Sequence, residues 1–236
     1  MDSAQLLMGL VWYVVFLLST TCHEAAHALV AMWGGDLTAY HGGQVSLDPV
    51  PHIRREPFGM VILPILSYAL NGWMMGWASA PYDPYWAERN PKPAAWKSLA
   101  GPAANFTLAI LAGVLIHVGL LAGWFIYPES LSFTRVVMAQ SDGAAAGAAT
   151  FLSILFSLNL LLGTFNLIPI PPLDGFSAIG VLLPERVAGQ LQRMRHTMGN
   201  YTFIGLLIAW KVFDPIFAPL YFSVFIKMLY PNQTYG

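Results

Sequence analysis

The chain has few charged residues and almost no cysteine. Charged side chains make up 10% of its 236 residues, against about 25% in an average soluble domain. Cys22 is the only cysteine, which excludes an internal disulfide and a cysteine-rich zinc finger. The net charge is −1, so the charge balance gives no sign of a nucleic-acid partner and we expect none.

What the chain has in abundance is apolar sequence. Hydrophobic residues make up 56% of it, and the mean hydropathy is +0.57. Long apolar runs in such a composition are typical of helices that cross a lipid bilayer. We therefore predict an all-α polytopic membrane protein, a bundle of about five to six transmembrane or re-entrant helices. We expect one integral-membrane domain over residues 1–236.

One stretch places three ionisable groups inside the first apolar run. Residues 23–27 read HExxH. Positions i and i+4 lie on one face of a helix, so His23 and His27 can bind one metal ion while Glu24 stands about 100° round the axis. Charges in the hydrocarbon core are costly unless they are paired or functional. The pattern predicts a zinc site, and the alternative is a trio that only packs and hydrogen-bonds.

The other apolar runs predict the remaining helices. In chain order, the expected spanning or re-entrant segments are residues 1–33, 58–80, 100–121, 145–168 and 201–230. Segment 58–80 is irregular because it carries Pro64 and Asn71-Gly72, and segment 201–230 is expected to break at Asp214-Pro215. Residues 184–196 alternate charged and apolar side chains, which predicts an amphipathic surface helix.

A short hairpin is expected after the first helix. Residues 37–40 and 44–47 are β-prone and flank His41-Gly42-Gly43, a pattern typical of two strands joined by a tight turn. His41 and His52 are isolated among loop residues, and we do not expect either of them to be a metal ligand.

A catalytic zinc site needs a third protein ligand and an open position. Asp174 is the best candidate because it follows segment 145–168 at a proline-rich break. At membrane depth, irregular backbone is tolerated only where it lines a cavity or is buried in protein. The alternative is a turn-forming Asp174-Gly175 pair. Asn105 is equally compatible with a packing amide and a site residue.

Three motifs occur together in a fixed order. They are HExxH in the first helix, Gly101-Pro102-x-x-Asn105 at a helix start, and Asn166-x-x-Pro169-(x)4-Asp174-Gly175. With the expected glycine-bearing hairpin, this combination resembles the site-2 protease family of intramembrane zinc metalloproteases over residues 15–185. The chain is similar to compact, core-only members, since it has no room for a PDZ or CBS domain.

The resemblance implies a zinc endopeptidase. It implies that His23, His27 and Asp174 bind one zinc ion per chain and that Glu24 is the catalytic base. Asn105 and Asn166 match positions that line the active site in this family, and an amide N–H of Asn166 would stabilise the oxyanion.

The expected partners follow from the same resemblance. They are the lipid bilayer and a transmembrane protein substrate that another protease has already trimmed, cut in or near its membrane segment. The free edge of the expected hairpin would hold the substrate by strand addition.

Two other classes of function stay open on the sequence alone. The buried histidines and glutamate would also suit a transporter or channel for metal or other ions. The chain would alternatively be an inactive membrane scaffold, against which the intact HExxH argues.

The metal site also constrains the topology. Its two ligand-bearing helices must run the same way, so one net crossing separates them and segment 58–80 should dip into the membrane and return. Eight basic residues then share the zinc side and Arg135 lies opposite; the eight are Arg54, Arg55, Arg89, Lys92, Lys97, Arg186, Arg193 and Arg195. The positive-inside rule places the N-terminus outside a prokaryotic cytoplasmic membrane and the active site nearer its cytoplasmic face.

Overall fold

The computed structural model describes residues 2–198 and 202–233 and is mostly helical. Within these residues, four helical stretches are long and apolar enough to cross a membrane: α1 (Ser3–Trp33), α6 (Pro91–Leu121), α7 (Ala144–Asn166) and Ile204–Leu229. A fifth apolar stretch, Phe58–Asn71, is shorter. The predicted helical membrane class is confirmed, with four candidate spanning helices and one shorter apolar stretch where about five to six spanning or re-entrant helices were predicted.

The last spanning stretch is assembled from three consecutive elements. They are α10 (Thr202–Leu220), the π-helix η4 (Tyr221–Ile226) and α11 (Lys227–Leu229). The predicted break at Asp214-Pro215 is wrong, since α10 continues through Pro215. A proline removes one backbone hydrogen bond, whereas ending the helix would leave several backbone groups without partners in an apolar surrounding.

Helix α1 begins and ends at sequence signals. The Asp2 carboxylate accepts a hydrogen bond from the Gln5 backbone N–H at 2.8 Å, and the Gln5 side chain accepts one from Asp2 N at 3.0 Å. The helix ends at Gly34, as predicted. At about 1.5 Å per residue, its 31 residues span about 46 Å, which exceeds a hydrocarbon core of about 30 Å. His27 therefore lies near one end of the span.

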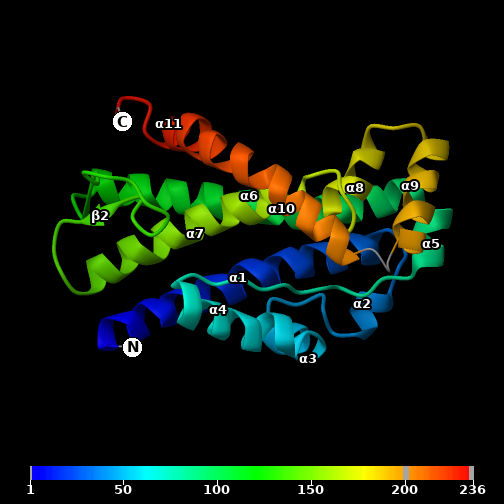
Figure 1. Ribbon diagram of the computed structural model, residues 1–236, viewed down its shortest axis with the longest axis horizontal. Coiled ribbons are helices and arrows are strands. Elements are labelled where there is room, and N and C mark those ends of the chain that lie inside the picture. The colour runs from blue at the N-terminus through cyan, green and yellow to red at the C-terminus, as the bar shows by residue number, and fades with distance from the viewer. Residues whose placement is uncertain (1, 199–201, 234–236) are drawn as a thin grey trace.

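The long helices alternate in direction. Figure 1 shows α1 and α7 running the same way, with α6 and α10 running opposite to them. Helix α6 makes its most extensive contacts with α7 and α1. Its buried Ala109, Ala112 and Gly113 are small, so neighbouring backbones can approach closely. The parallel course predicted for the two ligand-bearing helices is confirmed.

The chain between α1 and α6 leads away from the end of the bundle where α1 ends and then returns to that end. It passes through α2 (Thr38–His41), α3 (Pro49–Arg55), the π-helix η1 (Phe58–Ile62) and α4 (Leu63–Asn71), then through residues 72–83, which form no helix or strand, to α5 (Pro84–Arg89).

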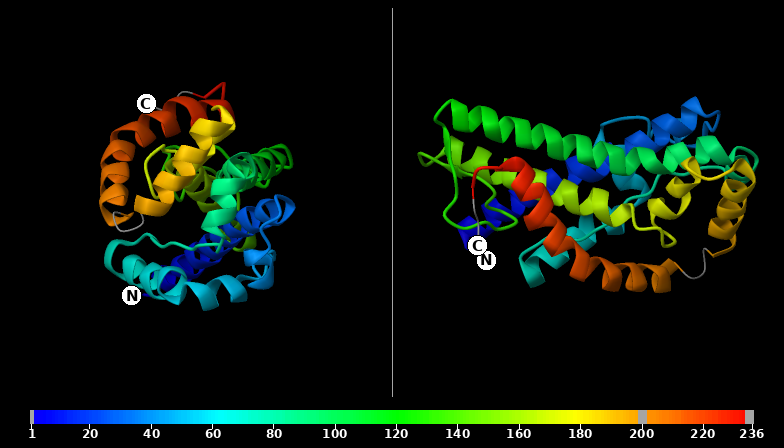
Figure 2. Two further views of the ribbon diagram at one scale, coloured as in Figure 1. Left: turned by 90° about the vertical axis from the view of Figure 1, so that its right-hand side faces the viewer. Right: turned by 90° about the horizontal axis from the view of Figure 1, so that it is seen from above.

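Hydrogen bonds place both ends of this excursion. The Tyr68 hydroxyl donates to the Gln5 carbonyl at 2.7 Å, near the start of α1. Asp83 N donates to Asp36 Oδ2 at 2.9 Å, just beyond the end of α1. Figures 1 and 2 show α4 leading away from the end that carries α5 and the extended segment leading back. That segment 58–80 re-enters the membrane stays a prediction, which its course away from this end and back supports.

The hairpin predicted after the first helix is wrong. Residues 38–41 form the short helix α2. Asp36 Oδ1 accepts hydrogen bonds from Thr38 N at 3.0 Å and Thr38 Oγ1 at 2.6 Å, which fixes a helical start. Gln44 N then donates back to the Ala39 carbonyl at 3.0 Å. With no strand here, the hairpin edge cannot hold a substrate.

The two-stranded sheet lies elsewhere. Strands β1 (Phe125–Ile126) and β2 (Met138–Ala139) pair antiparallel in the connection between α6 and α7. After α7 come α8 (Asp174–Ala178), the 3-10 helix η2 (Ile179–Val181) and α9 (Glu185–Thr197). Helix α9 is the predicted amphipathic helix. Figure 1 places α8 and α9 at the end of the bundle that carries α5, opposite to β2.

Candidate metal centre

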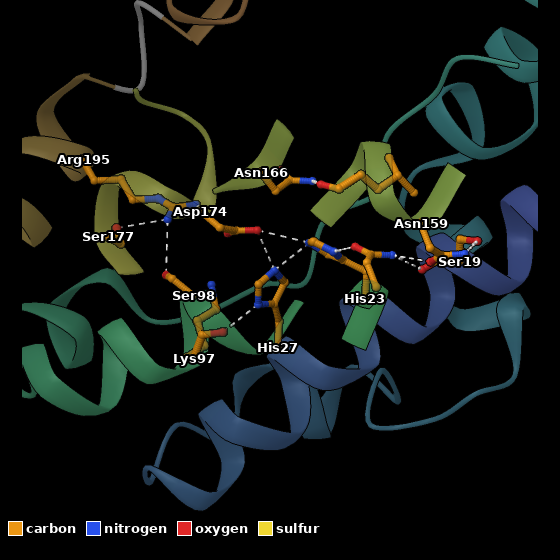
Figure 3. Close-up of polar contacts among 12 residues, drawn as sticks. Ser19, His23, His27, Lys97, Ser98, Asn159, Asn166, Asp174, Ser177 and Arg195 are labelled. Carbon is orange, nitrogen blue, oxygen red and sulfur yellow. Dashed lines mark hydrogen bonds and ion pairs between the residues drawn. The ribbon is translucent and has the colours of Figure 1, made fainter. Parts of the chain in front are cut away.

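Three polar side-chain atoms that could bind a metal converge where α1, α6 and α8 meet. His23 Nε2 and His27 Nε2 lie 2.9 Å apart, one helical turn apart on the same face of α1. Asp174 Oδ2 lies 3.1 Å from His23 Nε2 and 3.0 Å from His27 Nε2. The three residues are 7%, 4% and 7% exposed. Figure 3 shows all three side chains pointing to one point.

The proline-rich break delivers Asp174 to this point. Helix α7 ends at Asn166, the chain turns over the next seven residues, and α8 begins at Asp174. Gly175 is packed against the turn, because a Cβ at this position would strike the Leu167 carbonyl. The glycine of the Asp174-Gly175 pair therefore serves close packing.

Both histidines use their other ring nitrogen for an acceptor. His23 Nδ1 lies 2.6 Å from Asn105 Oδ1, and His27 Nδ1 lies 2.7 Å from the Lys97 carbonyl oxygen. Because a carbonyl oxygen can only accept, each Nδ1 carries the proton and each Nε2 keeps a lone pair for a metal.

The acceptor of His23 belongs to a longer buried chain. Asn105 Nδ2 donates to Asn159 Oδ1 at 2.8 Å, and Asn159 Nδ2 donates to Ser19 Oγ at 2.8 Å. Ser19 Oγ donates to the Val15 carbonyl at 2.7 Å. Asn105, Asn159 and Ser19 are each 0% exposed. This relay, defined as Asn105, Asn159 and Ser19, ties α6 and α7 to α1 behind the histidine.

The second oxygen of Asp174 faces a cation. Arg195 Nη2 of α9 lies 3.8 Å from Asp174 Oδ1. A carboxylate must be ionised to bind a metal, and a neighbouring cation favours the ionised form.

The residues present fit a metal ion. Two neutral imidazole nitrogens and a carboxylate form a donor set typical of catalytic zinc. Gly101 of α6 keeps the space in front of them open, since a Cβ there would strike both Nε2 atoms. Gly101 belongs to a motif found in the sequence, but its part in the site emerges only from this contact.

Glu24 lies beside the centre. Its carboxylate and the ring nitrogens of the two histidines are all within 4.8 Å of one another, and the residue is 7% exposed. In the part of the chain that the structure describes, this carboxylate makes no hydrogen bond or ion pair to protein. It is thus free to act on a water molecule or substrate.

The remaining candidates lie outside this constellation. Asn166 Nδ2 donates to the Leu162 carbonyl of its own helix at 3.0 Å, so no direct bond joins it to the histidines. His52 Nε2 contacts the Ser46 carbonyl at 3.1 Å. Asn159 and Arg195 were missed as site residues, because neither stands in a motif.

Comparisons with known proteins agree with this geometry. The sequence model described as "Peptidase family M50" matches residues 11–210. The chain is 29% identical over 225 residues to "Putative zinc metalloprotease YwhC" of Bacillus subtilis (strain 168), covering 88% of this chain and 92% of that protein.

Two mycobacterial relatives carry the name "Putative zinc metalloprotease Rip2". The protein of Mycolicibacterium smegmatis is 30% identical over 164 residues, which cover 70% of this chain and 54% of the relative. That of Mycobacterium tuberculosis (strain ATCC 25618 / H37Rv) is 30% identical over 195 residues, or 82% of this chain and 63% of the relative. No solved structure gives a significant match. The chain therefore belongs to Peptidase family M50, the family of site-2 zinc metalloproteases that its three motifs predict.

Proposed function

We propose that this metalloprotease is an intramembrane endopeptidase that cuts peptide bonds in or near transmembrane segments of other membrane proteins. The observation that carries the proposal is the convergence of His23 Nε2, His27 Nε2 and Asp174 Oδ2 within 3.1 Å of one another. This convergence occurs inside a bundle of apolar helices, where ionisable groups need a functional reason.

In this proposal His23, His27 and Asp174 hold one zinc ion per chain, and the fourth position stays open. Bound zinc would lower the pKa of a water molecule and polarise the scissile carbonyl. The chain supplies the orientation: Asn105 and the Lys97 carbonyl fix the two imidazoles, and Gly101 leaves the front of the site clear.

Glu24 acts as general base and then as general acid. Its carboxylate takes a proton from the attacking water and delivers it to the nitrogen of the leaving amine. Its position within 4.8 Å of the histidine nitrogens and its lack of a protein partner among the described residues support this role.

Two asparagines have different roles. Asn105 acts through His23 and is a positioning residue, because its Oδ1 accepts the hydrogen bond from Nδ1–H. Asn166 is the candidate to stabilise the oxyanion. One N–H of its amide is bonded to Leu162, and the second N–H is left for substrate.

The substrate must lose helical structure before water can attack it, since the carbonyls of an intact helix are internally bonded. Segments weakened by helix-breaking residues and already trimmed by another protease are therefore the preferred substrates.

The active site lies nearer the cytoplasmic face. Figure 1 places α5, α8 and α9 at one end of the bundle, where the basic residues Arg89, Arg186 and Arg193 also lie in α5 and α9. The positive-inside rule assigns this end to the cytoplasm. In a Cys22→Ala background, a cysteine at position 90 should label from the cytoplasm and one at 132 from outside; the reverse pattern would overturn the topology.

The proposed activity is tested by cleavage of a transmembrane test substrate with purified protein. Wild-type protein should cut it, and Glu24→Gln or a zinc chelator should abolish the cleavage. Near-normal turnover by Glu24→Gln would show that Glu24 is not the general base. No cleavage by the zinc-loaded wild type of any of several helix-weakened substrates would reject the endopeptidase.

A further inference from the structure

A second group of charged side chains adjoins the metal centre. Lys97 Nζ of α6 lies 4.1 Å from the ring centroid of Tyr82, and Arg195 Cζ of α9 lies 6.0 Å from the same centroid. Tyr82 belongs to the extended segment that returns from α4. One aromatic ring thus brings together two cations from different helices, and the mechanism above uses the side chain of neither.

Lys97 is a buried cation without a direct polar partner among the described residues. The residue is 5% exposed, and within the described part of the chain its Nζ makes no hydrogen bond or salt bridge. Lys92, on the same helix, behaves differently, because its Nζ donates to the carbonyls of Gly180, Val181 and Leu183. The carboxylates of Asp174, Glu24 and Asp36 attract the Lys97 charge without contacting it. The N–H donors of Lys97 are therefore available to an anion that enters the site.

Arg195 also keeps donors free. Its Nη1 donates to Ser177 Oγ at 3.1 Å and to Ser98 Oγ at 3.4 Å, as Figure 3 shows. Its Nη2 lies 3.8 Å from Asp174 Oδ1, which is too long for a hydrogen bond. A guanidinium carries five N–H donors, and this side chain is 18% exposed. Arg195 can therefore bind a further acceptor without giving up its two serines.

We propose that Lys97 and Arg195 form a carboxylate-binding subsite beside the metal centre. Its ligand is a carboxylate of the substrate, either an Asp or Glu side chain near the scissile bond or a free C-terminal carboxylate. A carboxylate matches the planar donors of arginine and the point charge of lysine. This inference rests on the proposed function, since the bound group belongs to the peptide that is cut.

The position of the two cations links the subsite to the reaction. The Lys97 carbonyl holds His27, and Arg195 lies against the Asp174 oxygen that does not face the histidines. A carboxylate bound between them would fix the register of the peptide relative to the metal. The protease would accordingly prefer substrates with an acidic group at one fixed distance from the cut bond.

Binding is best measured on zinc-loaded Glu24→Gln protein, which should hold a peptide without cutting it. The probes are fluorescent peptides of one apolar sequence with an amidated C-terminus, in which a single Glu or Gln is moved through successive positions. A further pair compares the free and the amidated C-terminus. We expect one carboxylate peptide to bind at least about 30-fold tighter than its amide counterpart, and the responding pair identifies the source of the carboxylate.

Charge removal then assigns the subsite. Lys97→Met and Arg195→Gln, each in the Glu24→Gln background and each measured at saturating zinc, should reduce the preference to below about threefold. Lys211→Met, which removes an exposed lysine of α10, is the matched control and should keep the preference.

Two results would overturn the subsite. The first is equal binding of every carboxylate and amide pair by the Glu24→Gln parent, which decides the matter even if a second substitution prevents folding. The second is an undiminished preference in both charge-removed variants. Failure of the wild type to cut the uncharged peptide would instead count against the protease, because binding is measured without cleavage.

Discussion

The two histidines of the metal centre are held in different ways. His23 donates a hydrogen bond from Nδ1–H to a side chain, Asn105, which the relay through Asn159 and Ser19 fixes in turn. His27 donates one from Nδ1–H to a backbone carbonyl, that of Lys97. We call each histidine with its acceptors an arm. The His23 arm depends on three side chains from three helices, whereas the His27 arm depends only on the course of α6. A substitution can therefore remove the support of His23, whereas the support of His27 comes from the backbone of α6 and persists when a side chain is changed.

At the metal itself the two arms should be equivalent. We expect His23→Ala and His27→Ala to lose zinc and to reduce cleavage to background alike, because each removes one of three ligands. Zinc analysis of the purified variants and cleavage of the test substrate check this. Full zinc content in either variant would remove that histidine from the ligand set.

A substitution at Gly101, which lies in front of both histidines, should be nearly as damaging as the loss of one histidine. Gly101→Ala adds a Cβ that strikes both Nε2 atoms, so most of the zinc and the activity should be lost. In a helix interior, Gly to Ala otherwise stabilises by about 0.5–1 kcal/mol. Gly147→Ala in α7 is the matched control, since its Cβ meets nothing within 4 Å. Equal zinc content in the two variants would show that Gly101 does not guard the site.

One step behind the metal, the arms should diverge. Asn105→Ala removes the acceptor of His23 and should lower zinc affinity about 10- to 100-fold. Lys97→Met keeps the backbone carbonyl that serves His27 and should leave zinc affinity unchanged. Competition with a chelator measures both. An equal loss in the two variants would contradict the contrast between side-chain and backbone support.

Further along the relay the effect should shift from zinc to stability. Asn159→Ala removes the shorter hydrogen bond of the buried Asn105 Nδ2 and leaves only its 3.4 Å bond to the Ser19 carbonyl, which should cost about 1–3 kcal/mol of stability and lower zinc affinity less than Asn105→Ala does. Thermal unfolding in detergent and zinc competition, measured on the same samples, test this order. An Asn159 variant that matches the wild type in both would show that the relay ends at Asn105.

The same contrast explains what could be predicted from the sequence. Asn105 stands in a motif, so it was a candidate, while Asn159 is a single amide in an apolar helix and has no partner at a recognisable spacing. The role of the Lys97 carbonyl cannot be recognised from the sequence, since every residue has a backbone carbonyl. The sequence predicted the three side chains that converge and the first side chain behind them, but not the support that comes from the backbone.

The fold shows a similar limit. Long apolar runs and Gly34 predicted α1, and Pro64 with Asn71-Gly72 predicted the irregularity of the segment that contains Phe58–Asn71. Residues 38–41 are helical after a turn in which Asp36 Oδ1 accepts from Thr38 N and Oγ1, and four residues of β-prone sequence cannot reveal such a turn. Pro215 did not end α10, because an apolar surrounding favours a continuous helix.

Zinc content per chain is the most direct test of the metal centre. Elemental analysis should find one zinc ion in the wild type and in Glu24→Gln, because Glu24 acts on water and is not a ligand, and little or none in Asp174→Ala. Cleavage, assayed on the same samples, should be present only in the wild type. No zinc in the wild type, or a full complement in Asp174→Ala, would contradict the proposed centre.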